Sequence, residues 1–367
     1  MTPLKARPGI MDITPYVGGE SALDDFERVI KLASNEGALG PSPQAVAAYE
    51  GVGSGLHRYP DGACGALRRA LGDIHQLDPS RIVCGAGSDE LIGLICRAYA
   101  GPGDEVLHTQ YGFLMYPIAA RTAGATPVAA PETKLTADID KLVERITSKT
   151  RILFLANPNN PTGTYLKAGQ LARLRRDMPA AVLLVIDAAY AEFVEDADYD
   201  PGTGLVEGGD NVVMTRTFSK IHGLGGARLG WAYCPAAIAD VLNRVRNPFN
   251  VSGPALAAGL AALKDRAFTD KARRHNRIWR EWTAEKLAAL GLDITPSAGN
   301  FLLVGFPAPA AGDNRQRGAD AADAYLKGRG IIVRRMAGYG LPDCLRISIG
   351  REDEMRAVAG ALKEFMD

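Results

Sequence analysis

The segment Thr215-Arg216-Thr217-Phe218-Ser219-Lys220 gives the strongest indication of the chemistry of this chain. Its lysine follows two hydroxyl side chains and an aromatic ring, and Arg228 comes eight residues later in a loop with four glycines. A lysine amine forms a covalent bond with an aldehyde once it is deprotonated. Glycine-rich backbone and a guanidinium, joined by the hydroxyls of Thr217 and Ser219, are suited to hold a phosphate. The segment therefore predicts a cofactor that bears both an aldehyde and a phosphate.

An acid stands at the end of an apolar run upstream of this segment. Asp187 follows residues 181–186, and the segment Asn157-Pro158-Asn159-Asn160-Pro161-Thr162-Gly163 precedes them. Ligands of open α/β sheets collect at the carboxyl ends of strands, where a carboxylate can keep a pyridine nitrogen protonated. Tyr190 could donate its hydroxyl to a ring oxygen. These residue types together are what a pyridoxal-phosphate enzyme requires. The alternative for Asp187 is a helix N-cap.

Other candidate residues lie on both sides of this central region. Gly87 and Ser88 follow a predicted strand and open a predicted helix, whose free amides attract phosphate; a plain capping turn is the alternative. Phe113 could stack on an aromatic cofactor or pack in the core. Arg334 and Arg346 interrupt apolar strands, where a guanidinium is costly without an anionic partner. The two arginines predict a substrate phosphate or carboxylate.

Short apolar runs alternate with helical patterns through the middle of the chain. Several runs are continuously apolar, which is typical of parallel strands that helices cover on both faces. The alternation predicts an α/β sheet with right-handed crossovers. The predicted strands are 81–84, 105–109, 126–130, 151–156, 182–187 and 211–217, with helices at 89–99 and 167–177.

From about residue 254 the pattern becomes a mixture of long helices and short strands. We expect helices at 254–263, 269–290, 318–329 and from 352, and strands at 300–306, 330–335 and 345–349. A chain of 367 residues is also too long for one ordinary core. We therefore predict a large cofactor-binding α/β domain over 30–253 and a small α+β domain made of 254–367 and the N-terminal arm, 1–29.

Composition narrows the classes of function. Apolar residues make up 47% of the chain and charged residues 23%, as in a soluble globular protein, and the formal net charge is zero. We therefore expect no nucleic acid and no membrane as partner. Five scattered cysteines show no pairing pattern and no metal-ligand spacing with the histidines. This cysteine pattern predicts free thiols and no metal site. Because the N-terminus also lacks the apolar stretch of a signal peptide, we expect a cytoplasmic protein.

These motifs together resemble fold-type I pyridoxal-phosphate aminotransferases, and more closely the class-II histidinol-phosphate aminotransferases. The similarity runs over nearly the whole chain, and the lysine segment and residues 160–163 are specific for the superfamily. The similarity includes Thr14-Pro15-Tyr16 and residues 32–36, 57–62 and 338–342. Within the chain, Tyr16, Arg58-Tyr59-Pro60 and Leu345-Arg346-Ile347-Ser348 indicate the subfamily. The resemblance implies an aspartate-aminotransferase-like fold: a mostly parallel seven-stranded sheet flanked by helices, with a smaller α+β domain.

The resemblance also implies a role for each candidate residue. The catalytic residues would be the Schiff-base lysine and proton shuttle Lys220, with Asp187 at the pyridine nitrogen and Tyr190 at the ring hydroxyl. The cofactor would be held by further residues at its ring and phosphate, namely Asn160, Phe113, Gly87, Ser88, Thr217, Ser219 and Arg228. Tyr59 would reach the phosphate from the neighbouring subunit of a homodimer. The small-molecule substrates would contact Tyr16, Asn35, Arg334 and Arg346.

The implied reaction is reversible amino transfer between L-histidinol phosphate and 2-oxoglutarate, giving imidazole-acetol phosphate and L-glutamate, in histidine biosynthesis. An aromatic amino acid aminotransferase is the nearest alternative; a phospho-amino-acid decarboxylase and a cofactor-binding regulatory module are others. Two motifs depart from the family pattern. Asp-Glu-Ala-Tyr is Asp187-Ala188-Ala189-Tyr190 here, which should spare catalysis, and Asn-Glu-Asn-Pro is Asn35-Glu36-Gly37-Ala38, which bears on the substrate-side loop.

Overall fold

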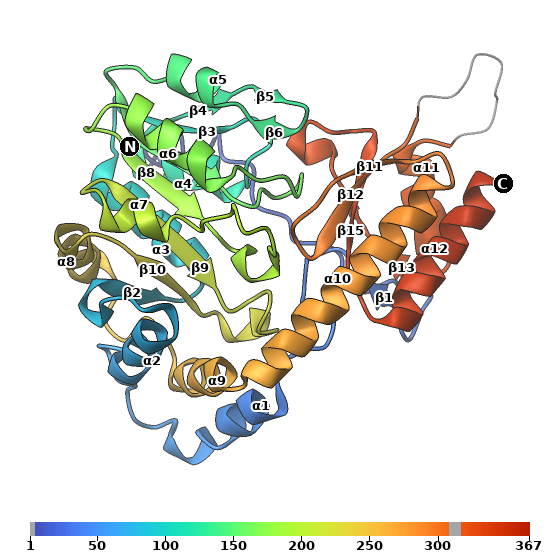
Figure 1. Ribbon diagram of the computed structural model, residues 1–367, viewed down its shortest axis with the longest axis horizontal. Coiled ribbons are helices and arrows are strands. Elements are labelled where there is room, and N and C mark those ends of the chain that lie inside the picture. Colours follow the sequence, from blue (N-terminus) through green and yellow to red (C-terminus); the bar gives the residue numbers. More distant parts are fainter. Residues whose placement is uncertain (1–3, 308–316) are drawn as a thin grey trace.

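The computed structural model describes residues 4–307 and 317–367, and a seven-stranded sheet is its centre (Figure 1). The strand order is β2-β10-β9-β8-β7-β3-β4, and only β10 runs against its neighbours. This confirms the predicted, mostly parallel sheet. The strands are β2 Ile82–Gly85, β3 Glu105–Thr109, β4 Thr126–Ala130, β7 Thr150–Ala156, β8 Leu183–Asp187, β9 Val212–Thr217 and β10 Gly230–Tyr233.

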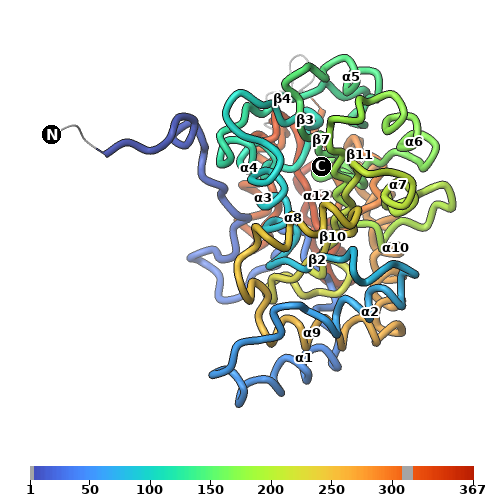
Figure 2. Tube along the Cα trace, turned by 90° about the vertical axis from the view of Figure 1, so that its left-hand side faces the viewer, coloured from blue at the N-terminus to red at the C-terminus, as the bar shows by residue number. Residues whose placement is uncertain are grey.

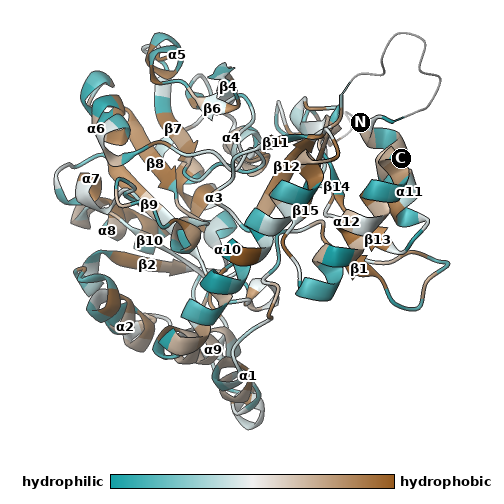
Figure 3. Ribbon diagram, turned by 45° about the vertical axis from the view of Figure 1, so that its right-hand side comes forward, coloured by the Kyte–Doolittle hydropathy of each residue, from teal (hydrophilic) through white to brown (hydrophobic). Residues whose placement is uncertain are grey.

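The central strands are buried on both faces, as their continuous apolar sequences predict. Along β7, Leu153 and Leu155 join one core cluster, while Ile152 and Phe154 join another. Successive side chains point to opposite faces of a strand, so one apolar run supplies both clusters. Figure 3 shows these strands as mostly hydrophobic, with hydrophilic residues on surrounding helices such as α6.

Helices from distant parts of the chain cover the two faces. The first face carries α3 Ser88–Tyr99, α4 Met115–Ala123 and α8 Ala236–Val245. The second face carries the helices α1 Pro43–Glu50, α2 Gly65–His75, α5 Ile139–Glu144, α6 Ala168–Asp177, α7 Thr203–Glu207 and α9 Gly253–Lys264. A short hairpin, β5 Glu132–Thr133 and β6 Thr136–Ala137, completes this part.

A smaller sheet with its own core lies beside the large one (Figure 1). It has the order β11-β12-β15-β14, and β1 pairs with β13 separately. The elements are β1 Ile30–Lys31, α10 Arg266–Ala288, β11 Asp293–Thr295, β12 Phe301–Gly305, α11 Ala319–Lys327, β13 Ile331–Ile332, β14 Arg334–Arg335, β15 Cys344–Ser348 and α12 Glu352–Met366. Helix α10 begins before the predicted 269 because Asp265 caps it, accepting from the Phe268 amide at 3.2 Å.

The N-terminal arm reaches both parts of the molecule. Its first described residues project from the body in Figure 2, and the Arg7 guanidinium donates to the Thr122 carbonyl at 2.6 Å. Further along, Glu20 pairs with Lys327 of α11 at 2.7 Å. Residues 1–3 and 308–316 of the predicted small domain lie outside the described residues. None of the helices that the structure describes has the length and apolarity needed to cross a membrane.

Candidate active site

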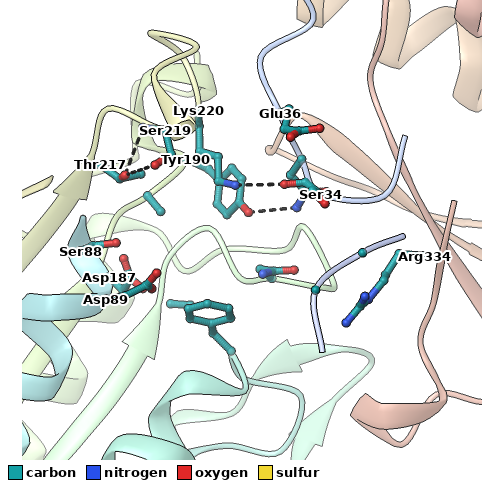
Figure 4. Close-up of a pocket in the computed structure, with 18 of the residues that line it drawn as sticks. Ser34, Glu36, Ser88, Asp89, Asp187, Tyr190, Thr217, Ser219, Lys220 and Arg334 are labelled. Atoms are coloured by element: carbon teal, nitrogen blue, oxygen red, sulfur yellow. Dashed lines mark hydrogen bonds between the residues drawn. The ribbon is translucent and has the colours of Figure 1, made fainter. Parts of the chain in front are cut away.

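A cavity of about 310 Å³ opens where the carboxyl ends of β7, β8 and β9 face the smaller sheet. Every predicted site residue except Gly87 and Tyr59 lines it. The lining residues among those predicted are Tyr16, Asn35, Ser88, Phe113, Asn160, Asp187, Tyr190, Thr217, Ser219, Lys220, Arg228, Arg334 and Arg346. Figure 4 shows Ser88 and Asp187 at one side of the cavity, Arg334 at the other, and Lys220 and Tyr190 between them.

Lys220 extends into this cavity from the segment after β9. Its amine donates to the Ser34 carbonyl at 3.3 Å and lies 5.8 Å from the centre of the Tyr190 ring (Figure 4). Burial, helped by the positive charge of Arg346, lowers the pKa of Lys220 to about 8. A lowered pKa makes the neutral, nucleophilic amine accessible near physiological pH.

Asp187 is the last residue of β8 and is buried. Strand register places it opposite Thr215 of β9, whose hydroxyl donates to Oδ1 at 3.1 Å. The Tyr116 hydroxyl donates to Oδ2 at 2.9 Å. Burial raises the pKa of Asp187 to about 6, and the nearby charge of Asp89 acts in the same direction. The carboxylate has two hydroxyl donors and no ion-pair partner among the described residues.

Alternation along β9 explains the Thr-x-Thr pattern of the opening segment. The hydroxyl of Thr215 reaches Asp187, and that of Thr217 donates to Ser219 at 2.9 Å. Arg216 points to the opposite face, where it pairs with Glu192 at 2.8 Å. The strand thus supplies hydroxyls to the cavity and keeps its guanidinium away from it.

The start of α3 and the loop after β9 together form an anion cradle. Gly87 is the N-cap of α3 and has no side chain to occupy the first helix amides. Arg228 lies above it, donating to Asp89 at 3.1 Å and to the Gly225 carbonyl at 3.1 Å. A Cβ at Gly87 would stand 2.3 Å from Arg228 Nη2, and its φ of +86° also favours glycine. Gly87 therefore makes room for the guanidinium, while Ser88 lines the cavity.

Tyr190 and Phe113 are the aromatic residues of the cofactor side. Burial raises the pKa of Tyr190, so its hydroxyl stays protonated, and Asn35 Nδ2 donates to that hydroxyl at 3.0 Å. Phe113 meets Tyr116 edge to face at 5.8 Å. Asn35 is itself held by Ser348 of β15, which donates to its Oδ1 at 3.0 Å. The polar atoms of Asn35 are therefore already bonded to protein.

Arg346 is the deeply buried arginine among the substrate-side residues. It is 6% exposed, donates to Asn160 Oδ1 and to the Ala33 carbonyl at 2.8 Å, and leaves Nε without a partner. Among the residues that the structure describes, no carboxylate pairs with it. Arg334 lies nearer the surface and donates to the Val17 carbonyl at 2.7 Å. A buried guanidinium without an acid favours an anionic ligand.

Tyr59 lies apart from this cavity. It is 82% exposed and stacks on Phe249, with ring centres 4.6 Å apart. An exposed aromatic pair on the surface of one chain fits a contact with another molecule better than a role in its own site.

The two departures from the family pattern have a local explanation. A Cβ at Gly37 would lie 2.9 Å from the Lys220 carbonyl oxygen and 3.0 Å from Gly223 Cα. The substrate-side loop therefore packs directly on the backbone that follows Lys220. Ala188 is fully buried in the core, where the ionised glutamate of the usual motif would be costly.

The residues present fit pyridoxal phosphate. Helix amides, hydroxyls and Arg228 suit its phosphate, and the unpaired Asp187 suits its ring nitrogen. The buried amine of Lys220 suits its aldehyde. Sequence reasoning missed Tyr116, which follows Phe113 by three residues; an aromatic residue at that helical spacing, bearing a hydroxyl in an apolar run, was the available signal.

An open α/β sheet with a buried lysine and an acid at its carboxyl edge is the arrangement of fold-type I pyridoxal-phosphate enzymes. Residues 27–362 match the family model for class I and II aminotransferases. The chain is 61% identical to the histidinol-phosphate aminotransferase of Paramagnetospirillum magneticum over 100% of this chain and 99% of that one. It is 60% identical to that of Rhodospirillum rubrum over 98% and 96% of the two chains.

Solved structures agree with these sequence matches. The histidinol-phosphate aminotransferase from Sinorhizobium meliloti, solved in complex with pyridoxal-5'-phosphate, superposes with a TM-score of 0.89 at 28% identity, covering 100% of this chain and 98% of that one. An aspartate aminotransferase from Thermus thermophilus shares the fold, with a TM-score of 0.81 at 22% identity over 92% and 91% of the two chains. The chain belongs to the histidinol-phosphate aminotransferases within the class I and II aminotransferase family.

Proposed function

We propose that the chain is a pyridoxal-phosphate-dependent aminotransferase that moves the amino group of L-histidinol phosphate to 2-oxoglutarate in histidine biosynthesis. The observation that carries this proposal is the buried Arg346, which lines the same cavity as Lys220 and lacks an acidic partner among the described residues. The names of relatives at 61% and 60% identity support the same substrate.

When bound, pyridoxal phosphate supplies an aldehyde that bonds to amines and a ring that accepts the electrons left by a departing proton. Lys220 provides the protein amine for that aldehyde. With a pKa of about 8, its amine is also a suitable base to take a proton from the substrate carbon and to return it. Asp187, as a carboxylate at the end of β8, would hold the ring nitrogen and favour its protonated form.

The remaining cavity residues orient the cofactor. Four residues at the anion cradle hold the phosphate: Ser88, Thr217, Ser219 and Arg228. Phe113 would pack on the ring, and Asn160 and Tyr190 would bind its hydroxyl. Because Gly87 lies beneath Arg228 and outside the lining, it acts by giving Arg228 its place.

On the substrate side, Arg346 and Arg334 bind the phosphate of histidinol phosphate together with Tyr16, and Arg346 binds a carboxylate when glutamate enters. A planar guanidinium meets either anion with two parallel hydrogen bonds. The side-chain amide of Asn35 is bonded to Tyr190 and Ser348. We therefore propose that Asn35 orients Tyr190 and contacts the substrate only as part of the cavity wall, without a hydrogen bond to it.

The first test compares substrates in the intact enzyme. kcat/KM is measured for histidinol phosphate, phenylalanine and tyrosine with 2-oxoglutarate as acceptor, then repeated with Arg334→Ala. Arg335→Ala is a matched control, because its guanidinium pairs with Asp320 and lies outside the cavity lining. We expect histidinol phosphate to be preferred, and only Arg334→Ala to reduce its turnover. Preference for phenylalanine, with no effect of Arg334→Ala, would refute the substrate.

We further propose a homodimer in which Tyr59 completes the cofactor site of its partner. Its exposed stack with Phe249 and its place outside its own cavity support this. Mixing Tyr59→Ala chains with Lys220→Ala chains then gives hybrid dimers with one intact site, so activity should return. Mixtures that exchange subunits and stay inactive would contradict the shared site.

We also propose a cellular location and a division into two domains. A cytoplasmic location is supported by the five cysteines, which are all free thiols. The division into a domain over 30–253 and a domain of 1–29 with 254–367 is supported by the separate cores of the two sheets.

A further inference from the structure

One tyrosine outside the cavity contacts the acid inside it. Tyr116 of α4 is fully buried and does not line the cavity, yet its hydroxyl donates to Asp187 Oδ2 at 2.9 Å. Burial and the charge of Asp187 hold the pKa of this phenol well above its usual value. The hydroxyl therefore stays protonated and acts as a donor to the carboxylate.

The ring of Tyr116 is fixed on two sides. It stacks on Phe154 of β7 at 4.7 Å with an interplanar angle of 4°, and it meets Phe113 edge to face at 5.8 Å and 89°. Phe113 lines the cavity. The side chain of Tyr116 thus contacts both Asp187 and Phe113, in a core where rotamers have little freedom.

We propose that Tyr116 is a positioning residue that keeps Asp187 ionised and aimed at the cofactor's ring nitrogen, so that the nitrogen retains its proton. This rests on the cofactor of the proposed function. A hydrogen bond to a carboxylate stabilises its charged form. Without the phenol, the carboxylate binds a proton more tightly, and the proton moves from the ring nitrogen to Asp187. The ring then draws electrons less strongly.

Other charged and polar groups also act on Asp187, and they remain when Tyr116 is replaced. Asp89 of α3 raises the pKa of Asp187, whereas Lys220 and the hydroxyl of Thr215 lower it. Tyr190, which follows β8, is a protonated phenol. Tyr116→Phe therefore changes one donor and no formal charge.

The test is Tyr116→Phe in the enzyme loaded with pyridoxal phosphate. Two positive charges in one conjugated system repel, so loss of the ring proton would make Lys220 Nζ, when bonded to the cofactor's aldehyde carbon, more basic. The apparent pKa of the visible absorbance should rise by about one to two pH units. kcat should fall about tenfold to a hundredfold, with KM for the amino donor unchanged.

Tyr233→Phe is the matched control. Tyr233 is also fully buried and also donates to a carboxylate, that of Glu207, but it lies away from the cavity. It should leave both the absorbance titration and kcat as in the parent. If Tyr116→Phe does not fold, a fluorinated tyrosine at position 116 replaces it; its stronger donor should move the apparent pKa downward.

The results for Tyr116→Phe separate a failure of this inference from a failure of the proposed function. An absorbance titration and a kcat for Tyr116→Phe equal to the parent's overturn the inference while the proposed function stands. A lower thermal midpoint with an unmoved titration assigns Tyr116 a purely structural role, which also overturns it. A parent chain that binds no pyridoxal phosphate refutes the proposed function and this inference together.

Discussion

Replacing Lys220 with methionine should stabilise the cofactor-free chain at neutral pH. In the folded chain burial lowers the pKa of this lysine from 10.5 to about 8, so the protonated amine is in an unfavourable setting. Methionine has a similar length and no charge. The same change removes the amine required for the proposed reaction, so stability and activity should move in opposite directions.

The magnitude follows from the pKa. The unfolded chain holds the lysine proton up to about pH 10.5 and the folded chain only up to about pH 8. Stability is therefore reduced below pH 8 and recovers as the pH rises from 8 to 10.5. A shift of about two and a half units at about 1.36 kcal/mol each amounts to about 3 kcal/mol. Since water in the open cavity screens part of this cost, we expect a gain of about 2 kcal/mol at pH 7.

The assay is urea unfolding of both chains without cofactor at pH 7 and at pH 10. The gain from Lys220→Met should be largest at pH 7 and shrink at pH 10. Lys149→Met, at an exposed lysine, should change little at either pH. A Lys220→Met chain less stable than the parent at pH 7, or a gain that grows with pH, would show that burial of the protonated amine does not destabilise the folded chain.

Three other substitutions test individual contacts. Arg346→Lys keeps the charge but loses the fork, so kcat/KM for glutamate and histidinol phosphate should fall at least about tenfold in steady-state assays. Gly87→Ala places a Cβ 2.3 Å from Arg228 Nη2 and should weaken pyridoxal-phosphate binding about tenfold by fluorescence titration, whereas Gly93→Ala, which meets open space, should not. Asp187→Asn removes the partner of the ring nitrogen and should lower both cofactor affinity in equilibrium dialysis and kcat by about tenfold or more.

The sheet was largely predictable because its strands are continuously apolar. Six of the seven strands were identified from such runs, and β10 was missed. It spans only Gly230–Tyr233 and begins inside the glycine-rich loop, so its sequence looked like part of a turn. Its glycine is there for packing, since a Cβ at Gly230 would lie 2.4 Å from the Ser88 amide nitrogen. Tertiary packing placed a strand where local sequence indicated a loop.

The sequence predicted the cavity residues that end parallel strands. It did not predict the contacts that buried side chains outside the cavity make with them. Asp187 and Thr217 end neighbouring strands, and register alone brings them to the same edge. The contact of Tyr116 with Asp187 joins positions 71 residues apart through the core, and no periodicity encodes it. Asn35 was predicted to contact the substrate because of its motif; it lines the cavity, and its bond to Tyr190 could not be read from the sequence.

Two cationic side chains and one carboxylate line the same cavity without forming an ion pair with one another. Lys220, Asp187 and Arg346 are each held in an unfavourable state by burial or by a missing partner, and no ion pair joins any two of them. Mutual pairing would have been the simplest way to stabilise the chain, but it would have closed the cavity. Their separation instead matches a ligand that brings an aldehyde, a basic nitrogen and an anion to three different places. A ligand that meets all three groups offsets the cost of each at once, whereas a substitution such as Lys220→Met removes the cost of one, so ligands should stabilise this fold more than any single substitution within the cavity.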